Sequence, residues 1–353
     1  MSASTQHLSP SEAAGRLGVS AKALRLYEQR GLLEPSRTTA GWRAYGREEM
    51  TRAAEIVALR ALGFSLAQVG RVLEGNAQGL EPTLTAHQAA LEGQLRRLAA
   101  TVEKIRGLRS DVAQGQTPTI GELAGLLVPA AEVSVAFDLP WPWGGERFEL
   151  RGIRPLNYII GPLGSGKTRL AHCLAQALPH AALLGLERVE GAAAARSRLN
   201  SDPALRSKFE RALAWLVEDG ATPSEALVVL LVGLEAEGPD TLVVDMIEQG
   251  LDAATQEALI AWLRRRGPGA RPIFLLTRSS AILDLAVVGS DEAIILCPAN
   301  HSPPTLVAPY PGAPGYEAVA TCLATPEVRA RTAGVVARRE PDKGLIGSTP
   351  QPA

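Results

Sequence analysis

The most chemically specific segment of the sequence is the glycine-rich run GPLGSGKT at residues 161–168. It follows LNYII, a run suited to a buried strand, and it leads into RLAHCLAQAL, which has helical spacing. In such a strand–loop–helix unit the glycines let backbone N–H groups cradle phosphates, the lysine reaches the terminal phosphate oxygens and the threonine hydroxyl binds Mg²⁺. We therefore expect ATP or ADP with Mg²⁺ at this phosphate-binding loop, or P-loop. The residues expected to hold it are Gly161, Gly164, Ser165, Gly166, Lys167 and Thr168.

An acidic residue further along the chain fits the same site. The run TLVVDMIEQGLD places Asp245 directly after four residues suited to a buried strand. A carboxylate at the end of a strand beside such a loop binds the hydration shell of the nucleotide's Mg²⁺. Thr168 and Asp245 are thus the predicted metal ligands. Because short apolar strands alternate with helices in this part of the chain, we expect an α/β domain with a mainly parallel sheet.

The N-terminal part of the chain has the pattern of short helices followed by a turn-rich segment. Ser9, Pro10 and Glu12 start one short helix, and Ser20 caps the next after a very short turn. Two helices joined so tightly form a helix-turn-helix, whose second helix enters a major groove. The run LLEPSRTTAGWRAYG is then predicted as a two-stranded wing. Residues 1–76 contain 10 Lys/Arg and 7 Asp/Glu, a net +3 against −4 for the remainder, which favours one nucleic-acid-binding end.

GVSAKALRLYEQRGLLEPSRTTAGWRAYGREEM resembles the start of the MerR family of regulators, and the likeness covers residues 8–76. The resemblance implies a dimer that binds a palindrome of double-stranded promoter DNA and distorts it, with RNA polymerase as a further partner. Ala23 and Leu26 depart from the threonine and the aromatic residue usual in the family, which should adjust contacts without abolishing the fold. The residues predicted to contact DNA are Ser20, Lys22, Arg25, Tyr27, Arg37, Arg43 and Tyr45.

Residues 80–115 are predicted to form one long helix with an apolar stripe. Apolar side chains recur at steps of seven, four, three, four, three and seven, which fits a heptad seam. A helix of this length cannot bury one stripe alone, so we expect a homodimer; MerR-like proteins are similar in pairing this helix as an antiparallel coiled coil. The alternative is that the stripe packs on the nucleotide domain of its own chain. The seam residues are Leu84, Leu91, Leu95, Leu98, Val102, Ile105 and Val112.

Over about residues 131–296 the sequence resembles ABC-type ATPases. GLDAATQEALIAWLRRR matches their D-loop and the helix after it, and ATPSEALVVLLVGL lies where their signature motif begins a helix. The departures predict slow or absent hydrolysis, because Met246 replaces the catalytic glutamate and cannot polarise water. Glu248 is the candidate general base if its loop curls inward, and otherwise a surface acid. Arg278, in place of the switch histidine, either contacts the γ-phosphate or is a solvated charge at a strand end.

The expected architecture is an α+β multidomain chain. Its predicted parts are a winged helix at 8–76, a dimerisation helix at 80–115, a linker at 116–130, the P-loop domain at 131–331 and a disordered tail at 332–353. The three cysteines have no metal-ligand spacing and none precedes Cys173, which argues against metal sensing of the kind known in the family. No apolar run approaches the ~18 residues of a membrane span, and the N-terminus lacks the pattern of a secretion signal. We therefore expect a cytoplasmic protein without a membrane partner.

These observations predict a DNA-binding transcriptional regulator of MerR type. Its promoter binding would be modulated by ATP or ADP bound to the C-terminal P-loop domain, with weak or no hydrolysis. Two alternatives stay open. One is a DNA-associated ATPase in repair or mobile-element defence, which fast, DNA-stimulated hydrolysis would favour. The other is a sensor of another phosphorylated metabolite, which competition with nucleotides would reveal.

Overall fold

A computed structural model describes residues 7–38, 40–76, 80–114, 116–119, 134–267 and 270–324. Met1–Leu323 form one compact unit. Most of the predicted linker and all of the predicted tail fall outside the described residues. None of the described helices is both long enough and apolar enough to cross a bilayer.

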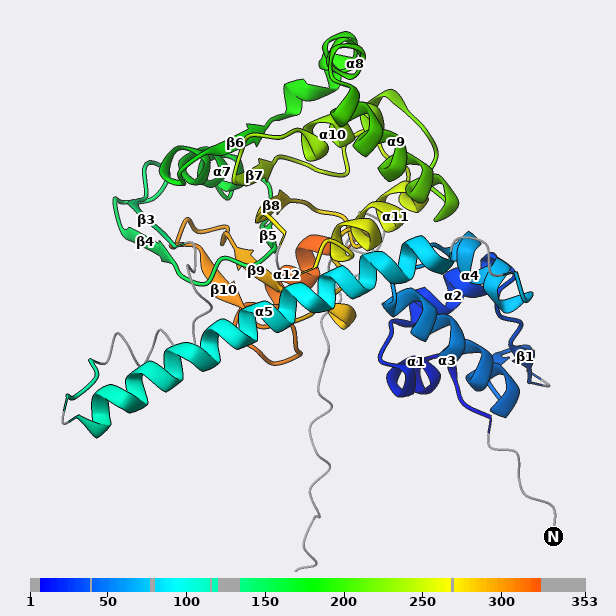
Figure 1. Ribbon diagram of the computed structural model, residues 1–353. Helices are drawn as coiled ribbons and strands as arrows, with labels where there is room; N and C mark the ends of the chain where they lie inside the picture. The colour runs from blue at the N-terminus through cyan, green and yellow to red at the C-terminus, as the bar shows by residue number, and fades with distance from the viewer. Residues whose placement is uncertain are drawn as a thin grey trace, which may run out of the picture. The chain divides into compact units, whose positions relative to one another are not determined.

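The N-terminal module has the predicted helix-turn-helix and wing (Figure 1). Ser9 and Glu12 form a capping box, in which the Ser9 N–H donates to the Glu12 carboxylate at 2.8 Å and the Glu12 N–H donates to the Ser9 hydroxyl at 3.3 Å. Leu24, Ile56 and Phe64 are fully buried in its core. The elements are α1 (Pro10–Leu17), α2 (Ala21–Gln29), β1 (Ser36–Arg37), β2 (Arg43–Ala44), α3 (Arg47–Ala61) and α4 (Leu66–Leu73).

The long helix α5 (Leu80–Ala113) has 34 residues, which corresponds to a length of about 50 Å. The seven residues of the predicted heptad seam expose between 39% and 66% of their surface. The C-terminal domain of the same chain therefore does not cover the seam, contrary to the alternative considered above. The coiled coil itself stays a prediction.

The P-loop domain is built on a six-stranded sheet in the order β10-β9-β5-β8-β7-β6. All neighbours are parallel except β10 and β9, so the predicted mainly parallel sheet is confirmed. β3 and β4 form a separate antiparallel pair. The strands are β3 (Val135–Asp138), β4 (Arg147–Leu150), β5 (Leu156–Ile160), β6 (Ala181–Leu184), β7 (Thr241–Val244), β8 (Ile273–Leu276), β9 (Glu292–Leu296) and β10 (Thr305–Val307).

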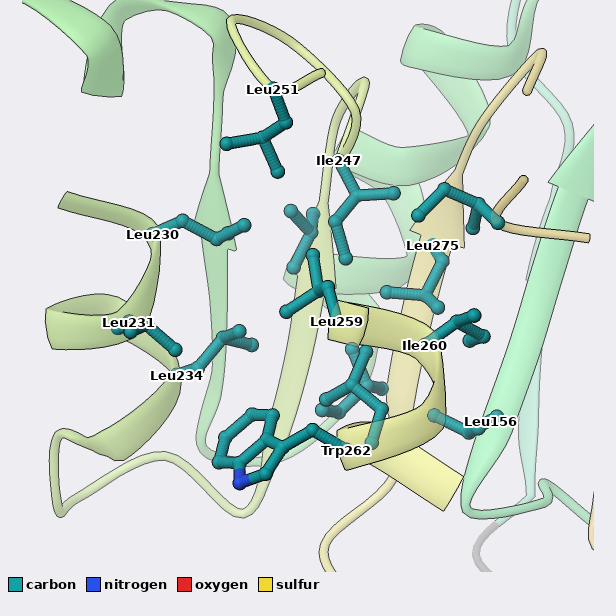
Figure 2. Packing of buried hydrophobic residues seen from close by; sticks show 14 of the residues in the cluster. Leu156, Leu230, Leu231, Leu234, Ile247, Leu251, Leu259, Ile260, Trp262 and Leu275 are labelled. Atoms are coloured by element: carbon teal, nitrogen blue, oxygen red, sulfur yellow. The ribbon is translucent and has the colours of Figure 1, made fainter. Parts of the chain in front are cut away.

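Side chains alternate between the two faces of this sheet, and both faces are covered. In β5, Tyr158 and Ile160 join one hydrophobic cluster while Ile159 joins the other. α7 and the β3–β4 pair pack on the side of Ile159. Helices α8 to α12 pack on the opposite side, and Figure 2 shows Leu259 and Trp262 among the leucines there. The helices are α7 (Lys167–Ala177), α8 (Ala192–Ser201), α9 (Pro203–Glu218), α10 (Glu225–Glu235), α11 (Ala253–Arg264) and α12 (Tyr316–Leu323), with short 3₁₀ turns η1 (Leu186–Gly191) and η2 (Leu285–Val287).

Candidate functional site

The P-loop joins β5, in the interior of the sheet, to the N-terminus of α7. Gly166 has φ +89°, and a Cβ there would lie 2.7 Å from the ring of Trp143. A Cβ at Gly161 would overlap the backbone carbonyl of Cys297. Only glycine allows the chain this close to its neighbours. The first N–H groups of α7 have no partner within the helix, so the loop ends at a natural binding position for an anion.

Lys167 lies folded over this loop with only 8% of its surface exposed. Its Nζ donates hydrogen bonds to the carbonyl oxygens of Gly161 at 2.8 Å and Pro162 at 2.6 Å. Burial lowers the pKa of Lys167, and the nearby cation of Arg278 lowers it further. An anionic ligand would offset both effects, because it supplies the negative charge that the buried ammonium lacks.

Thr168 and Asp245, the two predicted Mg²⁺ ligands, come together although 77 positions separate them in the sequence. The Thr168 hydroxyl donates to Oδ2 of Asp245 at 3.0 Å. Asp245 follows β7 directly and is 4% exposed. A hydroxyl and a carboxylate at the end of a parallel strand are the oxygen donors that suit a Mg²⁺ ion carried by a nucleotide.

These groups border a cavity of about 930 Å³. At its rim the side chain of Trp141 is 83% exposed. His301, from the segment after β9, places its Nε2 2.9 Å from the carbonyl oxygen of Gly164. No sequence pattern indicated His301, because this segment lies far from the P-loop in the chain. The cavity is lined by Trp141, Pro142, Leu163, Gly164, Ser165, Gly166, Lys167, Thr168, Arg169, Leu186, Asp245, Met246, Gln249, Arg278 and His301.

Arg188 is a second residue that the sequence analysis missed. Its guanidinium donates to the backbone carbonyl oxygens of Asp245 at 2.5 Å and Met246 at 2.6 Å. Met246, at the position of the expected catalytic glutamate, is held there in a left-handed conformation with φ 45°. Arg188 follows β6, the parallel neighbour of β7, so both chain segments leave the sheet at the same edge. The pairing of β6 with β7 explains why the two segments meet, but it does not indicate which side chain of η1 reaches the carbonyls.

Glu248 and Arg278 lie at the same edge with different roles. Oε1 of Glu248 accepts the backbone N–H of Arg278 at 2.9 Å. Arg278 lines the cavity, whereas Glu248 is not among the residues that line it. The turn after β7 thus places the Glu248 carboxylate at the end of β8, outside the lining of the cavity. The prediction of Glu248 as general base has no support in this geometry, in which it positions the chain at Arg278.

Three of the predicted DNA-contacting cations lie at the surface of the winged-helix module. Arg25 on α2 is exposed, and the side chain of Arg37 in the wing is 58% exposed. Nε of Arg43 donates to Glu28 at 2.5 Å. Nη2 of Arg37 lies 3.6 Å from the same carboxylate, so Glu28 pairs with both wing arginines. Contact of the three cations with DNA stays a prediction.

The other four predicted DNA residues cap a helix, lie in the core or contact the P-loop domain. The Ser20 hydroxyl accepts the N–H of Ala23 at 3.1 Å and so caps α2. Tyr27 and Tyr45 are 5% and 0% exposed and belong to the core of the module. Lys22 forms an ion pair with Glu257 of α11 at 2.8 Å. The rings of Tyr27 and Tyr45 thus contribute to packing, as expected from the position of Tyr27 on its helix, and their contact with DNA stays a prediction.

Comparison with known proteins reveals relatives for the N-terminal part. The nodulation protein NolA of Bradyrhizobium sp. (strain NC92) is 39% identical over 101 residues, which is 28% of this chain and 42% of NolA. The match thus spans less than half of NolA. A probable heavy metal-dependent transcriptional regulator of Haemophilus influenzae is 31% identical over 123 residues, which is 33% of this chain and 96% of that protein.

Among solved structures, the ADP conformation of an ATP-binding cassette of an ABC transporter is 13% identical, with 58% of this chain and 100% of that chain covered and a TM-score of 0.36. A likeness of this size supports no conclusion about function. The sequence match is firmer at the N-terminus, where the model of the MerR HTH family regulatory protein covers residues 8–76. The matched residues are those of the predicted module, and the structure there has the helix-turn-helix and wing. The match to the Haemophilus influenzae regulator extends over nearly its whole length. This chain belongs to the MerR family of regulatory proteins.

Proposed function

We propose that this chain regulates transcription as a homodimer that binds promoter DNA, and that ATP or ADP with Mg²⁺ in the P-loop cavity modulates its DNA affinity. The observation that carries the nucleotide half is the P-loop, whose Gly161 and Gly166 leave no space for a Cβ, beside the paired Thr168 and Asp245. Membership of the MerR family supports the DNA half.

The donor set of the cavity fits a nucleotide phosphate. Lys167 would exchange its loop carbonyl partners for phosphate oxygens, whose negative charge attracts the ammonium more strongly than an uncharged carbonyl does. Thr168 and Asp245 would hold the Mg²⁺ ion, which supplies charge neutralisation to the phosphates. Arg278 at the cavity wall is a cation available for the terminal phosphate.

The same geometry favours binding over turnover. Met246 carries no group that can accept a proton from water, and Arg188 fixes its backbone. Glu248 is engaged with the backbone of Arg278. With neither side chain serving as a base, we expect weak or no hydrolysis, so that occupancy of the cavity carries the signal.

The DNA half of the proposal needs two copies of the chain. The solvent-exposed seam of α5 supports pairing through this helix. A symmetric dimer would present two copies of α2 to a palindrome, with Arg25 and Arg37 available for phosphate contacts. Bending or untwisting a site costs a few kcal/mol. A bound ligand can change a free energy of that size. Nucleotide could therefore change how far the promoter is distorted and, through this, the access of RNA polymerase.

Fluorescence anisotropy tests this proposal with the full-length chain and a labelled duplex from the region upstream of its own gene. Affinity is measured without nucleotide, with ADP and Mg²⁺, and with ATP and Mg²⁺. We expect the affinities to differ by at least about fivefold, the lower end of allosteric coupling. The Lys167→Met variant should bind the duplex equally well in all three conditions. Identical affinities for the wild type in all three would refute nucleotide modulation and leave DNA binding intact.

A further inference from the structure

Asp219 occupies an unusual position for a carboxylate. It caps the C-terminal end of α9, where the helix dipole disfavours an anion. Its side chain is only 2% exposed, and burial raises the pKa of its carboxyl. A buried anion at such a place is unfavourable unless it is paired and hydrogen-bonded. Partners outside α9 must therefore account for it.

Those partners come from the winged-helix module. The guanidinium of Arg60 on α3 donates to both carboxylate oxygens of Asp219, with Nη2 3.1 Å from Oδ2. The N–H of Leu66, the first residue of α4, donates to Oδ1 at 2.8 Å, so the positive end of α4 also faces the anion. Beside this pair, Nε1 of Trp215 donates to the carbonyl oxygen of Gly63 at 3.3 Å. The turn between α3 and α4 is thus bound to the end of α9 through a paired, hydrogen-bonded carboxylate.

Two further contacts extend this surface. Glu218 accepts hydrogen bonds from the Ser65 hydroxyl at 2.9 Å and from Arg71 at 3.2 Å. Glu257 of α11 pairs with Lys22 at 2.8 Å. Lys22 lies in the first turn of α2, the helix expected in the DNA major groove. The carboxylate of Glu257 therefore pairs with a lysine that is expected to contact a DNA phosphate.

The residues that bind the winged helix connect to the nucleotide cavity. The chain runs from Asp245 through a short turn to Asp252, whose carboxylate caps α11 by accepting the Thr255 N–H at 2.7 Å. Glu257 follows on the same helix. The Thr255 hydroxyl accepts the N–H of Thr222 at 2.9 Å, three residues beyond Asp219. A change in the turn after β7 can thus reach both contact points through hydrogen-bonded neighbours.

We propose that the P-loop domain binds its own winged-helix module in competition with DNA, with Asp219 holding the α3–α4 turn and Glu257 neutralising Lys22. The inference rests on the proposed DNA-binding function and names the contact that regulates it. In the docked chain the start of α2 borders a cavity of about 590 Å³ shared with α11. DNA binds the undocked fraction, so the apparent affinity falls in proportion to that fraction. Nucleotide in the P-loop cavity shifts the docking equilibrium through α11.

The first test measures binding of the full-length chain to a short fluorescein-labelled duplex of random sequence. Glu257→Gln removes the charge that holds Lys22 while keeping the side-chain shape. Glu237→Gln removes the same charge from an exposed pair with Lys208 and is the matched control. We expect Glu257→Gln to bind about two- to fivefold more tightly than the control, the range for an ion pair as exposed as this one, with a salt dependence steeper by about one ion. In a Lys22→Gln background, Glu257→Gln should bring no gain, so the double variant should bind the duplex as Lys22→Gln does.

The second test follows docking itself by hydrogen exchange. Asp219→Asn keeps an acceptor for the Leu66 amide but removes the charge that pairs with Arg60, so the Leu66 amide should exchange faster and the duplex should bind more tightly. If wild type and all variants bind the duplex with equal affinity, DNA binding stands and competition is refuted. If none of them binds any duplex, the DNA-binding function fails, and competition fails with it.

Discussion

Lys167→Met is the sharpest perturbation of the nucleotide cavity. The substitution removes a buried ammonium whose Nζ now donates to two loop carbonyls at 2.8 and 2.6 Å and would donate to phosphate in the complex. A hydrogen bond to a charged group contributes about 1.5–3 kcal/mol. The dissociation constant for ATP with Mg²⁺ should therefore rise by about 10- to 150-fold. Methionine retains most of the side-chain volume, so the fold should persist.

Thermal unfolding with and without ATP and Mg²⁺ measures this loss. At a ligand concentration about 100 times the wild-type Kd, binding stabilises the wild type by about 2.7 kcal/mol, and a 100-fold weaker variant by about 0.4 kcal/mol. For a domain of this size the Tm shift should fall from about 5–10 °C to about 1 °C. Lys208→Met, which removes a lysine paired with Glu237 outside the cavity, should keep the full shift. An equal shift for Lys167→Met and wild type would refute the phosphate role of Lys167.

Three further outcomes follow from the same contacts. Gly161→Ala should destabilise the chain by about 1–3 kcal/mol in urea unfolding, because its Cβ would overlap the carbonyl of Cys297; Gly191→Ala, whose Cβ would meet nothing within 4 Å, should be neutral. Burial raises the pKa of Cys297 from 9.0 to about 12, so its thiolate near neutral pH is about 1,000-fold scarcer than that of an ordinary thiol. Iodoacetamide, followed by mass spectrometry, should label it in urea and hardly at all in the native chain; equal labelling would contradict its burial. Leu95→Ser with Leu98→Ser, at positions 66% and 64% exposed, should turn a dimer into monomers in sedimentation velocity, whereas a dimer that persists would place the interface elsewhere.

The parts of the site that could be predicted from the sequence are those encoded locally or by strand topology. The P-loop joins one strand to the next helix, so a short run of residues defines it. Thr168 and Asp245 meet because both follow strands of one parallel sheet. The winged helix was equally accessible, since Ser9 and Ser20 form caps that involve only residues three positions away.

The parts that could not be predicted depend on which long side chain reaches which distant backbone. Arg188 contacts the turn at Met246, 58 positions away, and Arg60 contacts Asp219, 159 positions away. Many arginines in this chain have the same local surroundings, so sequence does not single these two out. Tyr45 was predicted to contact DNA but is buried. Its amphipathic ring suits a surface contact as well as a core. Only the packing of the module decides between them.

The absence of a base at Met246 constrains how such a regulator would respond to nucleotide. A chain that hardly hydrolyses ATP does not reset itself by turnover, so its state follows the concentrations of the ligands that it exchanges. A ligand shifts an equilibrium only by its differential affinity for the two states, and moving a population from about 10% to about 90% needs a factor of about 80, or about 2.6 kcal/mol. One charged hydrogen bond from Arg278 to a terminal phosphate, at about 1.5–3 kcal/mol, is of that size. The proposed docking equilibrium therefore requires Arg278, at the cavity wall, to reach that phosphate in only one of the two states. ADP lacks the phosphate and would then shift docking less than ATP, without any chemical step.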